Sequence, residues 1–365
     1  MRRVNGREGR WALRFRSAFG NMLAVPGGPD PRRRVRLGRT VRVAALAATL
    51  AGCGLSSPQT TLDPRSDFAR QSHSIFMQIF WWDTAIFVVV AAILVLAILR
   101  FRERDPQALP VQIRGNAKLE LTWTIVPAVI LTFIAFPTVG AIFRTQALPA
   151  PDALRVRVVG HQWWWEFHYP DLGITTATDL YLPAGQRVTL ELSSTDVIHS
   201  FWVPALGGKR DTPPGLLNRI LLTPAVPGEF PGQCAEFCGA SHANMRHWAV
   251  VLPAADFQGW VARQKAPPAE PAEGSPAAQG RQVFSTSACV GCHTIQGVSG
   301  GQLGPDLSHL ASRKTIAGGM LKNDAGSLAR WLKNPPEVKP GSLMPDLKLT
   351  DGQVSALVAY LTSLK

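Results

Sequence analysis

Outside its first 42 residues the chain has almost no excess of charge of either sign. Those 42 residues hold 12 Arg against Glu8 and Asp30, whereas the remainder holds 26 basic and 23 acidic residues, a net of +3. Most of the total charge of +13 therefore belongs to the N-terminus. Beyond residue 42 no run rich in Lys or Arg lies beside exposed aromatic residues, so nucleic acid has little support as a partner.

Cysteine is scarce, and its five residues form one single position followed by two close pairs. Cys53 stands alone, Cys234 and Cys238 form the first pair, and Cys289 and Cys292 form the second. In an exported protein such pairs can oxidise to disulfides, which is the simplest alternative. The residues around each pair favour binding of a metal or a cofactor instead.

Residues 1–52 predict an N-terminal extension and a lipoprotein-type export signal. A basic run precedes the apolar stretch 43–51, and the small Gly52 leads directly to Cys53. Basic, apolar and small residues follow one another in this order in a signal peptide with its cleavage site. The segment resembles a bacterial lipoprotein signal, so a lipid anchor is expected at Cys53. An ordinary signal with an incidental cysteine is the alternative.

Two long apolar segments predict a transmembrane hairpin. Residues 75–99 are apolar almost throughout, and residues 121–143 carry no charge. Each spans roughly 35 Å as a helix, enough to cross a bilayer. The connecting residues 100–120 contain five basic side chains, so the positive-inside rule assigns them to the cytoplasm. Residues 53–74 and the chain beyond the second helix are then expected on the outer side.

The rest of the chain predicts two domains joined by a linker. Residues 264–279 contain four Pro among Ala and Glu, so a semi-extended linker that lets the last domain approach and leave is expected. Residues 280–365 are expected to form a compact helical unit, whose last helix begins with a capping box of Thr350 and Gln353. Residues 150–263 predict a small antiparallel sandwich or barrel from short β-type runs at 154–159, 187–192, 200–203 and 247–252.

The second cysteine pair lies in Cys289-Val-Gly-Cys292-His293, the attachment pattern of a c-type haem. In this pattern two thiols form thioether bonds with the haem vinyl groups and the adjacent His ligates the iron. Five Cys and eight His placed at random give the pattern in about one chain in a thousand. Half of a zinc site is the alternative, but residues 280–365 contain no second Cys pair.

The sixth iron ligand is expected to be a thioether or an imidazole from the other side of the haem. Met344 is favoured because it lies in a Pro-rich loop just ahead of the last helix, where monohaem cytochromes c typically place this ligand. Met320 and His309 are the alternatives within the domain. A Met that simply fills the core is a further one.

The first cysteine pair belongs to a group of soft donors. Two thiolates, two imidazoles and a thioether suit copper far better than magnesium or calcium. A single blue-copper site needs only one Cys, and a second thiolate four residues away allows both sulfurs to bridge two coppers. A disulfide would leave the spacing of the other donors unexplained. The donors are His199, Cys234, Cys238, His242 and Met245.

With these motifs in this order, residues 53–365 resemble subunit II of cytochrome c oxidase, in the caa-type variant with a fused cytochrome c. The resemblance implies a multidomain membrane protein with a two-helix transmembrane hairpin, a cupredoxin-like Greek-key β-barrel and an all-α cytochrome c domain. It also implies that the five soft donors and the backbone carbonyl of Glu236 hold a binuclear copper A centre. The Glu236 side chain would help to bind magnesium at the border with subunit I.

The resemblance assigns roles to two further residues. Trp163, in Gly160-His-Gln-Trp163-Trp164-Trp165, matches the aromatic residue through which electrons enter, and core packing is the alternative. The family commonly has Tyr where this sequence has Trp164. Glu120 corresponds to the carboxylate at the mouth of a proton channel into subunit I. A Glu at a helix N-terminus is also favourable without any such role.

The implied function is that of the electron-input subunit of a respiratory haem-copper oxidase, an oxidoreductase and translocase. Electrons from cytochrome c would pass through haem c and copper A to subunit I. There haem a and copper B would reduce oxygen to water with proton translocation, so no residue of this chain is expected to carry the oxygen chemistry. Subunit III and membrane lipid are further expected partners. The expected location is the bacterial inner membrane, as a multi-pass protein with the copper and haem domains on the periplasmic side.

Other classes of protein fit the motifs less well. A free-standing electron carrier would keep both metal sites but would not need the two-helix anchor or Glu120. A structural lipoprotein would use the cysteines as disulfides. Nitrous oxide reductase shares the copper motif, but eight His in the whole chain cannot also furnish its His-rich catalytic cluster. A quinol oxidase subunit is disfavoured because the copper ligands are all present.

Overall fold

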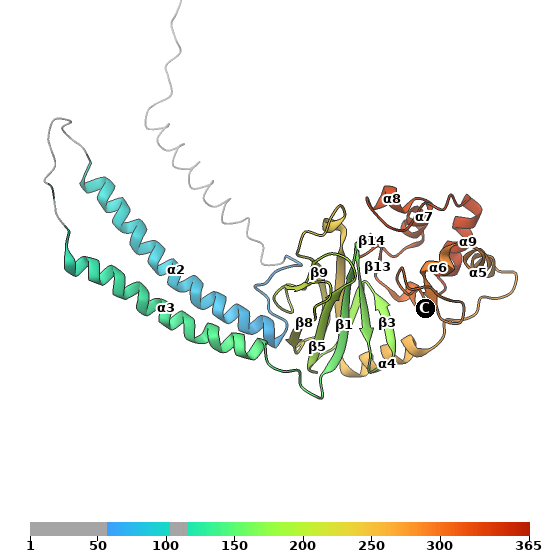
Figure 1. Ribbon diagram of the computed structural model, residues 1–365, viewed down its shortest axis with the longest axis horizontal. Coiled ribbons are helices and arrows are strands. Elements are labelled where there is room, and N and C mark those ends of the chain that lie inside the picture. The colour runs from blue at the N-terminus through green and yellow to red at the C-terminus, as the bar shows by residue number, and fades with distance from the viewer. Residues whose placement is uncertain (1–56, 103–111, 113–114) are drawn as a thin grey trace, which may run out of the picture. The chain divides into compact units, whose positions relative to one another are not determined.

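The computed structural model describes residues 57–102, 112 and 115–365 (Figure 1). The expected export signal with Cys53, and most of the connection between the two apolar segments, lie outside the described residues.

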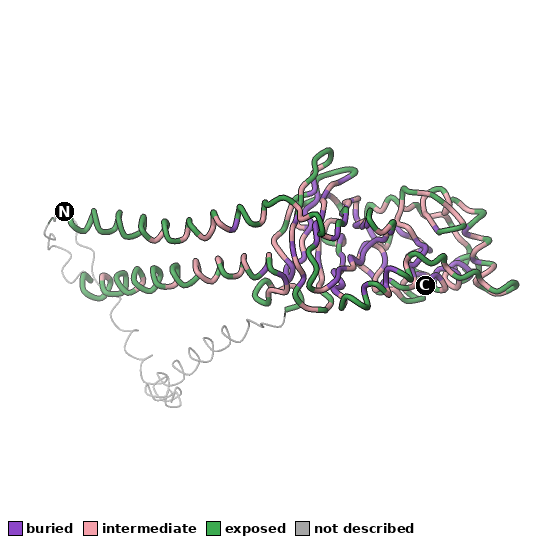
Figure 2. Tube along the Cα trace, turned by 90° about the horizontal axis from the view of Figure 1, so that it is seen from below, coloured by how far each residue is buried: buried purple, intermediate pink, exposed green. Residues whose placement is uncertain are grey.

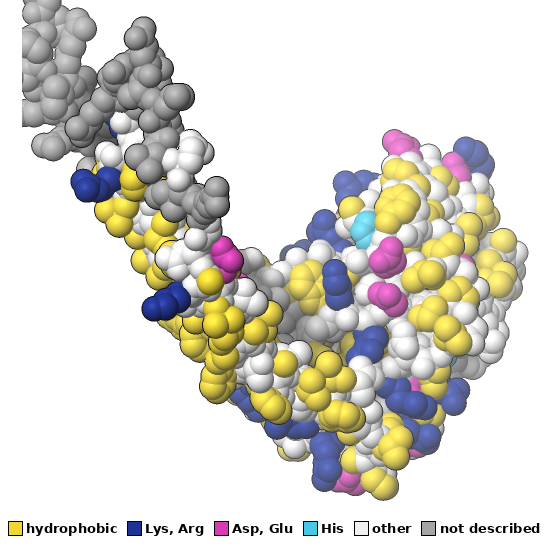
Figure 3. Space-filling model, turned by 60° about the vertical axis from the view of Figure 1, so that its left-hand side comes forward, with side chains coloured by type: hydrophobic (Ala, Val, Ile, Leu, Met, Phe, Trp, Pro, Cys, Tyr) yellow, Lys and Arg dark blue, Asp and Glu magenta, His cyan; other side chains and the backbone are white. Residues whose placement is uncertain are grey.

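Two long helices, α2 (Asp67–Arg100) and α3 (Ala117–Thr145), contain the apolar segments. Both begin several residues before the expected spans, because Ser66 and Asn116 cap them: each side chain accepts hydrogen bonds from backbone N–H groups of the first turn. Their most apolar stretches are 0% and 6% buried. Hydrophobic side chains dominate the face of the helices seen in Figure 3, and Figure 2 shows exposure along both. Such surfaces require lipid, so the helices form the transmembrane hairpin.

The start of α2 is joined to the following domain by two polar contacts and one aromatic contact. Ser66 is fully buried and donates its hydroxyl to the carbonyl of Leu206 at 2.5 Å. Asp67 accepts a hydrogen bond from the backbone N–H of Thr223 at 2.6 Å. The Phe68 ring lies against Gly207 and Gly208, where an added Cβ would meet it at 3.1 and 3.3 Å. These contacts fix the outer end of α2 against the β-domain.

The β-domain consists of two five-stranded sheets, ordered β3-β2-β1-β5-β8 and β4-β10-β9-β6-β7. The pairs β1/β5 and β4/β10 are parallel, and the other neighbouring pairs are antiparallel. The expected Greek-key barrel is therefore present as two facing sheets that do not close into a strict barrel. The bounds are β1 Leu154–His161, β2 Trp164–Tyr169, β3 Ile174–Ala177, β4 Asp179–Pro183, β5 Val188–Ser194, β6 His199–Trp202, β7 Arg210–Thr212, β8 Asn218–Leu222, β9 Gly228–Cys234 and β10 Arg246–Leu252.

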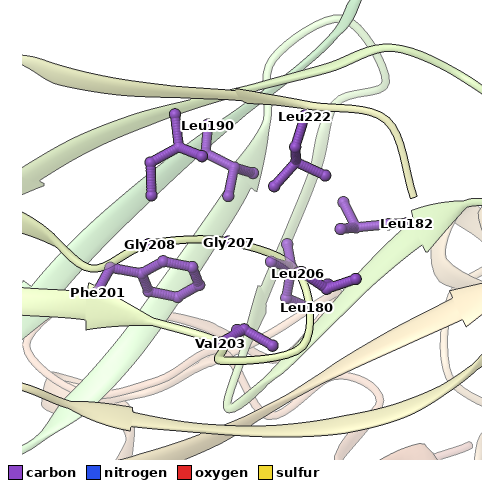
Figure 4. Close-up of a pocket in the computed structure, with 10 residues that line it drawn as sticks. Leu180, Leu182, Leu190, Phe201, Val203, Leu206, Gly207, Gly208 and Leu222 are labelled. Carbon is purple, nitrogen blue, oxygen red and sulfur yellow. The ribbon is translucent and has the colours of Figure 1, made fainter. Parts of the chain in front are cut away.

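Alternating side chains fill the space between the two sheets. In β1 the buried positions are Leu154, Val156, Val158 and Gly160, with more exposed residues between them. Figure 4 shows apolar side chains from both sheets, among them Leu182 and Leu190, converging on a cavity of about 10 Å³. This volume is about that of one water-sized probe and its walls are apolar, so the space is packed core and not a ligand site.

The C-terminal part is mainly helical. Helix α5 crosses α9 closely at Gly280, where an added Cβ would lie 1.9 Å from the carbonyl oxygen of Ala356. The expected capping box of Thr350 and Gln353 is present at the start of α9. Two small ribbons, β11/β12 and β13/β14, add to the expected all-α domain. The bounds are α5 Pro276–Thr286, α6 Cys289–Cys292, β11 Thr294–Ile295, β12 Ser299–Gly300, β13 Thr315–Ile316, β14 Leu321–Lys322, α7 Ala325–Lys333, α8 Pro335–Val338 and α9 Asp351–Leu361, with 3-10 turns η1 His242–Asn244 and η2 Leu310–Ser312.

The segment expected as a linker is shorter in the structure. Helix α4 (Ala254–Lys265) includes its first two residues, and α5 includes its last four. Helix α4 buries Phe257, Trp260 and Val261 against the core of the β-domain. The remaining residues 266–275 connect the two helices, and Glu270 forms an ion pair with Arg281 of α5 at 2.7 Å.

Candidate metal and haem sites

The two thiols of the first cysteine pair face one another at one end of the β-sandwich. Cys234 Sγ and Cys238 Sγ are 3.7 Å apart, far beyond the roughly 2.05 Å of a disulfide bond, and both are free thiols. Both side chains are buried, at 4% and 3% exposure. The first pair is therefore available to a metal.

The other expected donors surround these thiols. His199 Nδ1 lies 3.9 Å from Cys234 Sγ, and the Glu236 carbonyl oxygen lies 3.3 Å from the same sulfur. His242 Nδ1 and Met245 Sδ lie 3.5 and 3.9 Å from Cys238 Sγ. The donor atoms of His199, Cys234 and Cys238 lie within 4.8 Å of one another. A buried set of sulfur and imidazole donors at these spacings fits a pair of copper ions.

Strand pairing brings these distant residues together. His199 begins β6 and Cys234 ends β9, and these strands pair with Phe201 opposite Cys234. The backbone N–H of Cys234 also donates to the carbonyl of Met245 at 2.9 Å, which closes the loop between β9 and β10. The 3-10 turn η1, which begins at His242, shapes that loop. The site is thus assembled from two strands and one loop.

Electrostatics prepare the first cysteine pair for metal binding. The hydrogen bond from the Cys238 thiol lowers the pKa of Cys234 to about 3, with further help from His199, and the same interaction raises the pKa of Cys238. The lowered pKa of Cys234 favours the thiolate, which is the form that binds metal.

Asp196 holds the ring of His199. Its Oδ1 lies 2.8 Å from His199 Nε2, and its carboxylate also accepts from the backbone N–H groups of Gln162 and Val197. Burial opposes ionisation, but the bonds from His199 and these backbone groups lower the Asp196 pKa. Because the Asp196 carboxylate bonds to Nε2, the His199 ring is held with Nδ1 towards the sulfur atoms. In the sequence Asp196 lies three residues before His199, where the resemblance to subunit II implies an acidic residue near the copper site, and the structure adds its bond to the His199 ring.

Trp163 contacts the copper loop directly. Its indole N–H donates to the carbonyl of Cys238 at 2.9 Å, and the Gln162 side-chain amide donates to the same oxygen at 2.7 Å. The side chain is only 7% exposed. The aromatic residue expected at the electron entry point is therefore bonded to a candidate copper ligand and is covered.

The haem motif occupies one short turn of helix. Cys289 and Cys292 are free, half-buried thiols at the two ends of α6, and His293 follows immediately. His293 Nδ1 bonds to the carbonyl of Pro305 at 2.8 Å, which leaves Nε2 free for iron. Burial lowers the His293 pKa and so favours the neutral imidazole that a metal requires. An added Cβ at Gly304 would lie 2.6 Å from the His293 ring, so the ring packs directly on this backbone.

The candidates for the sixth iron ligand differ in their contacts. Met344 and Met320 are both half-buried and pack against the core of the C-terminal domain. His309 Nε2 instead bonds to the carbonyl of Gln264 at 3.1 Å. This contact engages the His309 ring and leaves the two thioethers as the better candidates.

The two carboxylates with expected roles are both exposed. Glu120 lies in the first turn of α3, and Glu236 lies in the loop between the two buried cysteines. Each is therefore accessible to a partner or an ion.

Comparisons with known proteins agree with this architecture. Family models of cytochrome c oxidase subunit II match residues 59–140 (transmembrane domain) and 173–251 (periplasmic domain), and a cytochrome c model matches residues 277–365. Cytochrome c oxidase subunit 2 of Alkalihalophilus pseudofirmus is 37% identical over 334 residues, which cover 90% of this chain and 97% of that protein. The chain belongs to the cytochrome c oxidase subunit 2 family.

Other members and solved structures are similar to this subunit 2 chain. The subunit 2 protein of Bacillus subtilis is 34% identical over 349 residues, covering 88% of this chain and 96% of the relative. A crystal structure of the periplasmic domain of subunit II of cytochrome oxidase from Bradyrhizobium japonicum is 30% identical, with a TM-score of 0.31, and covers 32% of this chain and 97% of that one.

Family membership fixes the general character of the molecule. A cytochrome c oxidase subunit 2 with a cytochrome c domain is part of a haem-copper oxidase, an oxidoreductase, and has subunit I as a partner. The matched domains imply copper A and haem c as cofactors. The two apolar helices and the periplasmic domain indicate a membrane protein with its β-domain outside the cytoplasm.

Proposed function

We propose that the chain is the electron-input subunit of a respiratory oxidase, in which a covalent haem c accepts electrons from cytochrome c and a copper A pair delivers them to subunit I. Oxygen reduction to water at haem a and copper B, with proton translocation, then takes place in subunit I. The convergence of four candidate copper ligands on the buried thiols of Cys234 and Cys238 carries this proposal.

The copper-binding residues act as a rigid, largely water-free cradle. Four of the five side chains among them are buried, so little rearrangement is needed when the charge of the site changes. Asp196 orients one imidazole, and Trp163 with Gln162 holds the carbonyl of Cys238. The proposed ligands are His199, Cys234, Cys238, His242, Met245 and the Glu236 carbonyl.

The haem-binding residues are proposed to attach and ligate one haem c. Cys289 and Cys292 would carry the thioether bonds, His293 would supply the proximal imidazole, and Met344 the sixth ligand. The hydrogen bond from His293 to Pro305 supports this role, because it fixes the tautomer with Nε2 free.

Further roles are proposed where the chain would meet subunit I and the membrane. The exposed Glu236 side chain is proposed to help bind magnesium beside subunit I, and Glu120 to open a proton path into that subunit. The proposed location is the bacterial inner membrane, with copper and haem on the periplasmic side and a lipid anchor at Cys53. Subunit III and membrane lipid are the remaining proposed partners.

Purification of the oxidase from native membranes tests this function. Metal analysis with optical and EPR spectra should give two coppers and one haem c per chain, together with a larger haem-bearing partner. A well-folded sample in which Cys234 and Cys238 are joined in a disulfide and no copper is bound would overturn the copper assignment. Absence of a partner subunit would favour a free-standing electron carrier.

A further inference from the structure

Lys339, in the loop that leads to Met344, is a buried basic residue. Only 3% of it is exposed. Its Nζ donates to three backbone carbonyls, of Trp163 at 2.6 Å, Ala317 at 2.8 Å and Asn244 at 3.1 Å. Two of these carbonyls belong to the copper domain and one to the haem domain. The side chain therefore joins the domains without an acidic partner, since none of the ion pairs found among the described residues includes it.

Two glycines allow the haem domain to lie directly on Trp163. An added Cβ at Gly341 would be 2.6 Å from Cη2 of the Trp163 ring. At Gly318 it would be 2.4 Å from the Trp163 carbonyl oxygen and 2.6 Å from Lys339 Nζ. Both glycines have positive φ, 81° and 69°, so both the space and the backbone conformation require glycine there. The ring that contacts the copper loop on one side is thus covered by haem-domain backbone on the other.

Further hydrogen bonds flank Lys339 across the same boundary. The Ser241 hydroxyl donates to the carbonyl of Pro340 at 2.7 Å, and the backbone N–H of Arg246 donates to the carbonyl of Gly318 at 2.8 Å. The buried Asp179 of β4 accepts from the backbone N–H of Lys314 at 2.8 Å. We call residues 313–319 and 339–341, which make these contacts, the docking segments.

We propose that Lys339 is a positioning residue that fastens the loop carrying Met344 onto Trp163 and so holds the haem domain against the copper centre. This inference rests on the proposed function. It assigns the covered face of Trp163 to the chain's own haem domain, so an external donor delivers its electrons to the haem domain and not to Trp163.

The chemistry of the ammonium group explains why Lys occupies this position. It has three N–H donors and three carbonyl acceptors within reach, so every donor has a partner. A thioether or alkyl group of similar length would leave these buried carbonyls without a donor, which is costly. The planar guanidinium of Arg is larger than an ammonium, and Gly318 already lies against Nζ, so Arg would not fit the same space.

A cleavage experiment on the whole oxidase tests the role of Lys339. Residues 266–269 are replaced by a protease recognition sequence, ahead of the Glu270 pair with Arg281. The oxidase is immobilised through subunit I, cleaved and washed, and retained haem c is measured by its absorbance. Lys339→Met should weaken docking about a hundredfold, the size expected for two hydrogen bonds from a charged donor. The washed variant should then lose its haem domain. Lys322→Met, which removes an exposed charge from the same domain, should retain it like the unmodified chain.

A second measurement separates positioning from folding in the uncleaved oxidase. In Lys339→Met, reduction of haem c by a small artificial donor should keep its rate, while transfer from haem c to copper slows. Retention of the haem domain after cleavage, or an unchanged transfer rate, overturns the inference.

Two further results keep the inference separate from the proposed function. If Lys339→Met yields no haem-loaded chain, Gly318→Ala is used in its place, because the added methyl group displaces the ammonium from the Trp163 carbonyl. Retention of the haem domain after cleavage, or an unchanged rate of transfer from haem c to copper, would again overturn the inference. Absence of haem c or copper from the unmodified oxidase would contradict the proposed function and, with it, the inference.

Discussion

The two cysteine pairs of this chain present their sulfur atoms in opposite ways. Cys289, Cys292 and His293 lie on one turn of helix and the start of the next segment, so local backbone geometry alone sets their spacing. Cys234 and Cys238 instead depend on His199, which lies on another strand, and on a loop closed by Met245. The contiguous haem motif needs only one short helix to form, whereas the dispersed copper site needs the folded β-sandwich.

The largest expected effect comes from breaking the dispersed site. Cys238→Ser should abolish binding of the copper pair, because this sulfur contacts Cys234, His242 and Met245 at once. Metal analysis and EPR of the purified oxidase measure the loss. Haem c content should stay at one per chain. Copper binding at the unmodified level would show that Cys238 is not a ligand.

The mirror experiment breaks the contiguous motif. Cys292→Ser together with Cys289→Ser removes both thioether bonds, so haem c should no longer be attached covalently. Haem staining of the denatured chain measures this. The copper signal should persist if the two sites assemble independently, and its loss would show that the haem domain is needed to complete the copper site.

A smaller effect is expected from the residue that orients a copper ligand. Asp196→Asn keeps the size of the side chain but removes the carboxylate that bonds to His199 Nε2. Copper affinity should fall by about 10- to 100-fold, as is usual for such outer contacts. Competition with a copper chelator measures the affinity. Asp171→Asn, at an exposed carboxylate of the same domain, is the matched control and should leave copper affinity unchanged.

The smallest expected effect is on acid stability of the copper domain. Burial opposes ionisation of Glu166, but the hydrogen bonds from His161 and His168 lower its pKa from 4.5 to about 2. Its carboxylate therefore contributes stability above pH 4.5, at most about 3 kcal/mol, and this is lost as the pH falls towards 2. Glu166→Gln should remove the loss of stability between pH 4.5 and 2. Thermal unfolding at a series of pH values, detected by the release of copper, measures this loss. An unchanged pH profile would contradict it.

Haem absorbance, recorded in the same acid titration, compares the acid stability of the haem domain with that of the copper domain. In the haem domain the hydrogen bond from Lys333 lowers the pKa of Asp351, but the Asp351 side chain is 90% exposed. Solvent screening makes this ion pair weak. The copper domain should therefore respond to acid before the haem domain does.

Much of the architecture was predictable because its signals are local. The apolar segments, the haem motif and the capping box of α9 depend on neighbouring residues, and the structure has helices at each of these places. Helix α4 was missed, because the Pro-rich composition after residue 264 hid its end. Its apolar residues Phe257, Trp260 and Val261, spaced as on one helix face, were the available signal.

The sequence by itself determined the family, the order of the domains and the donor types of both metal sites, because these depend on composition and on the spacing of residues close together in the chain. Only the tertiary structure decided that the thiols are 3.7 Å apart, that Asp196 holds His199, and that Lys339 donates to the Trp163 carbonyl. These contacts join residues from 3 to 176 positions apart in the chain. Burial decides their strength, since a charge or a carbonyl removed from water must find its partner within the fold.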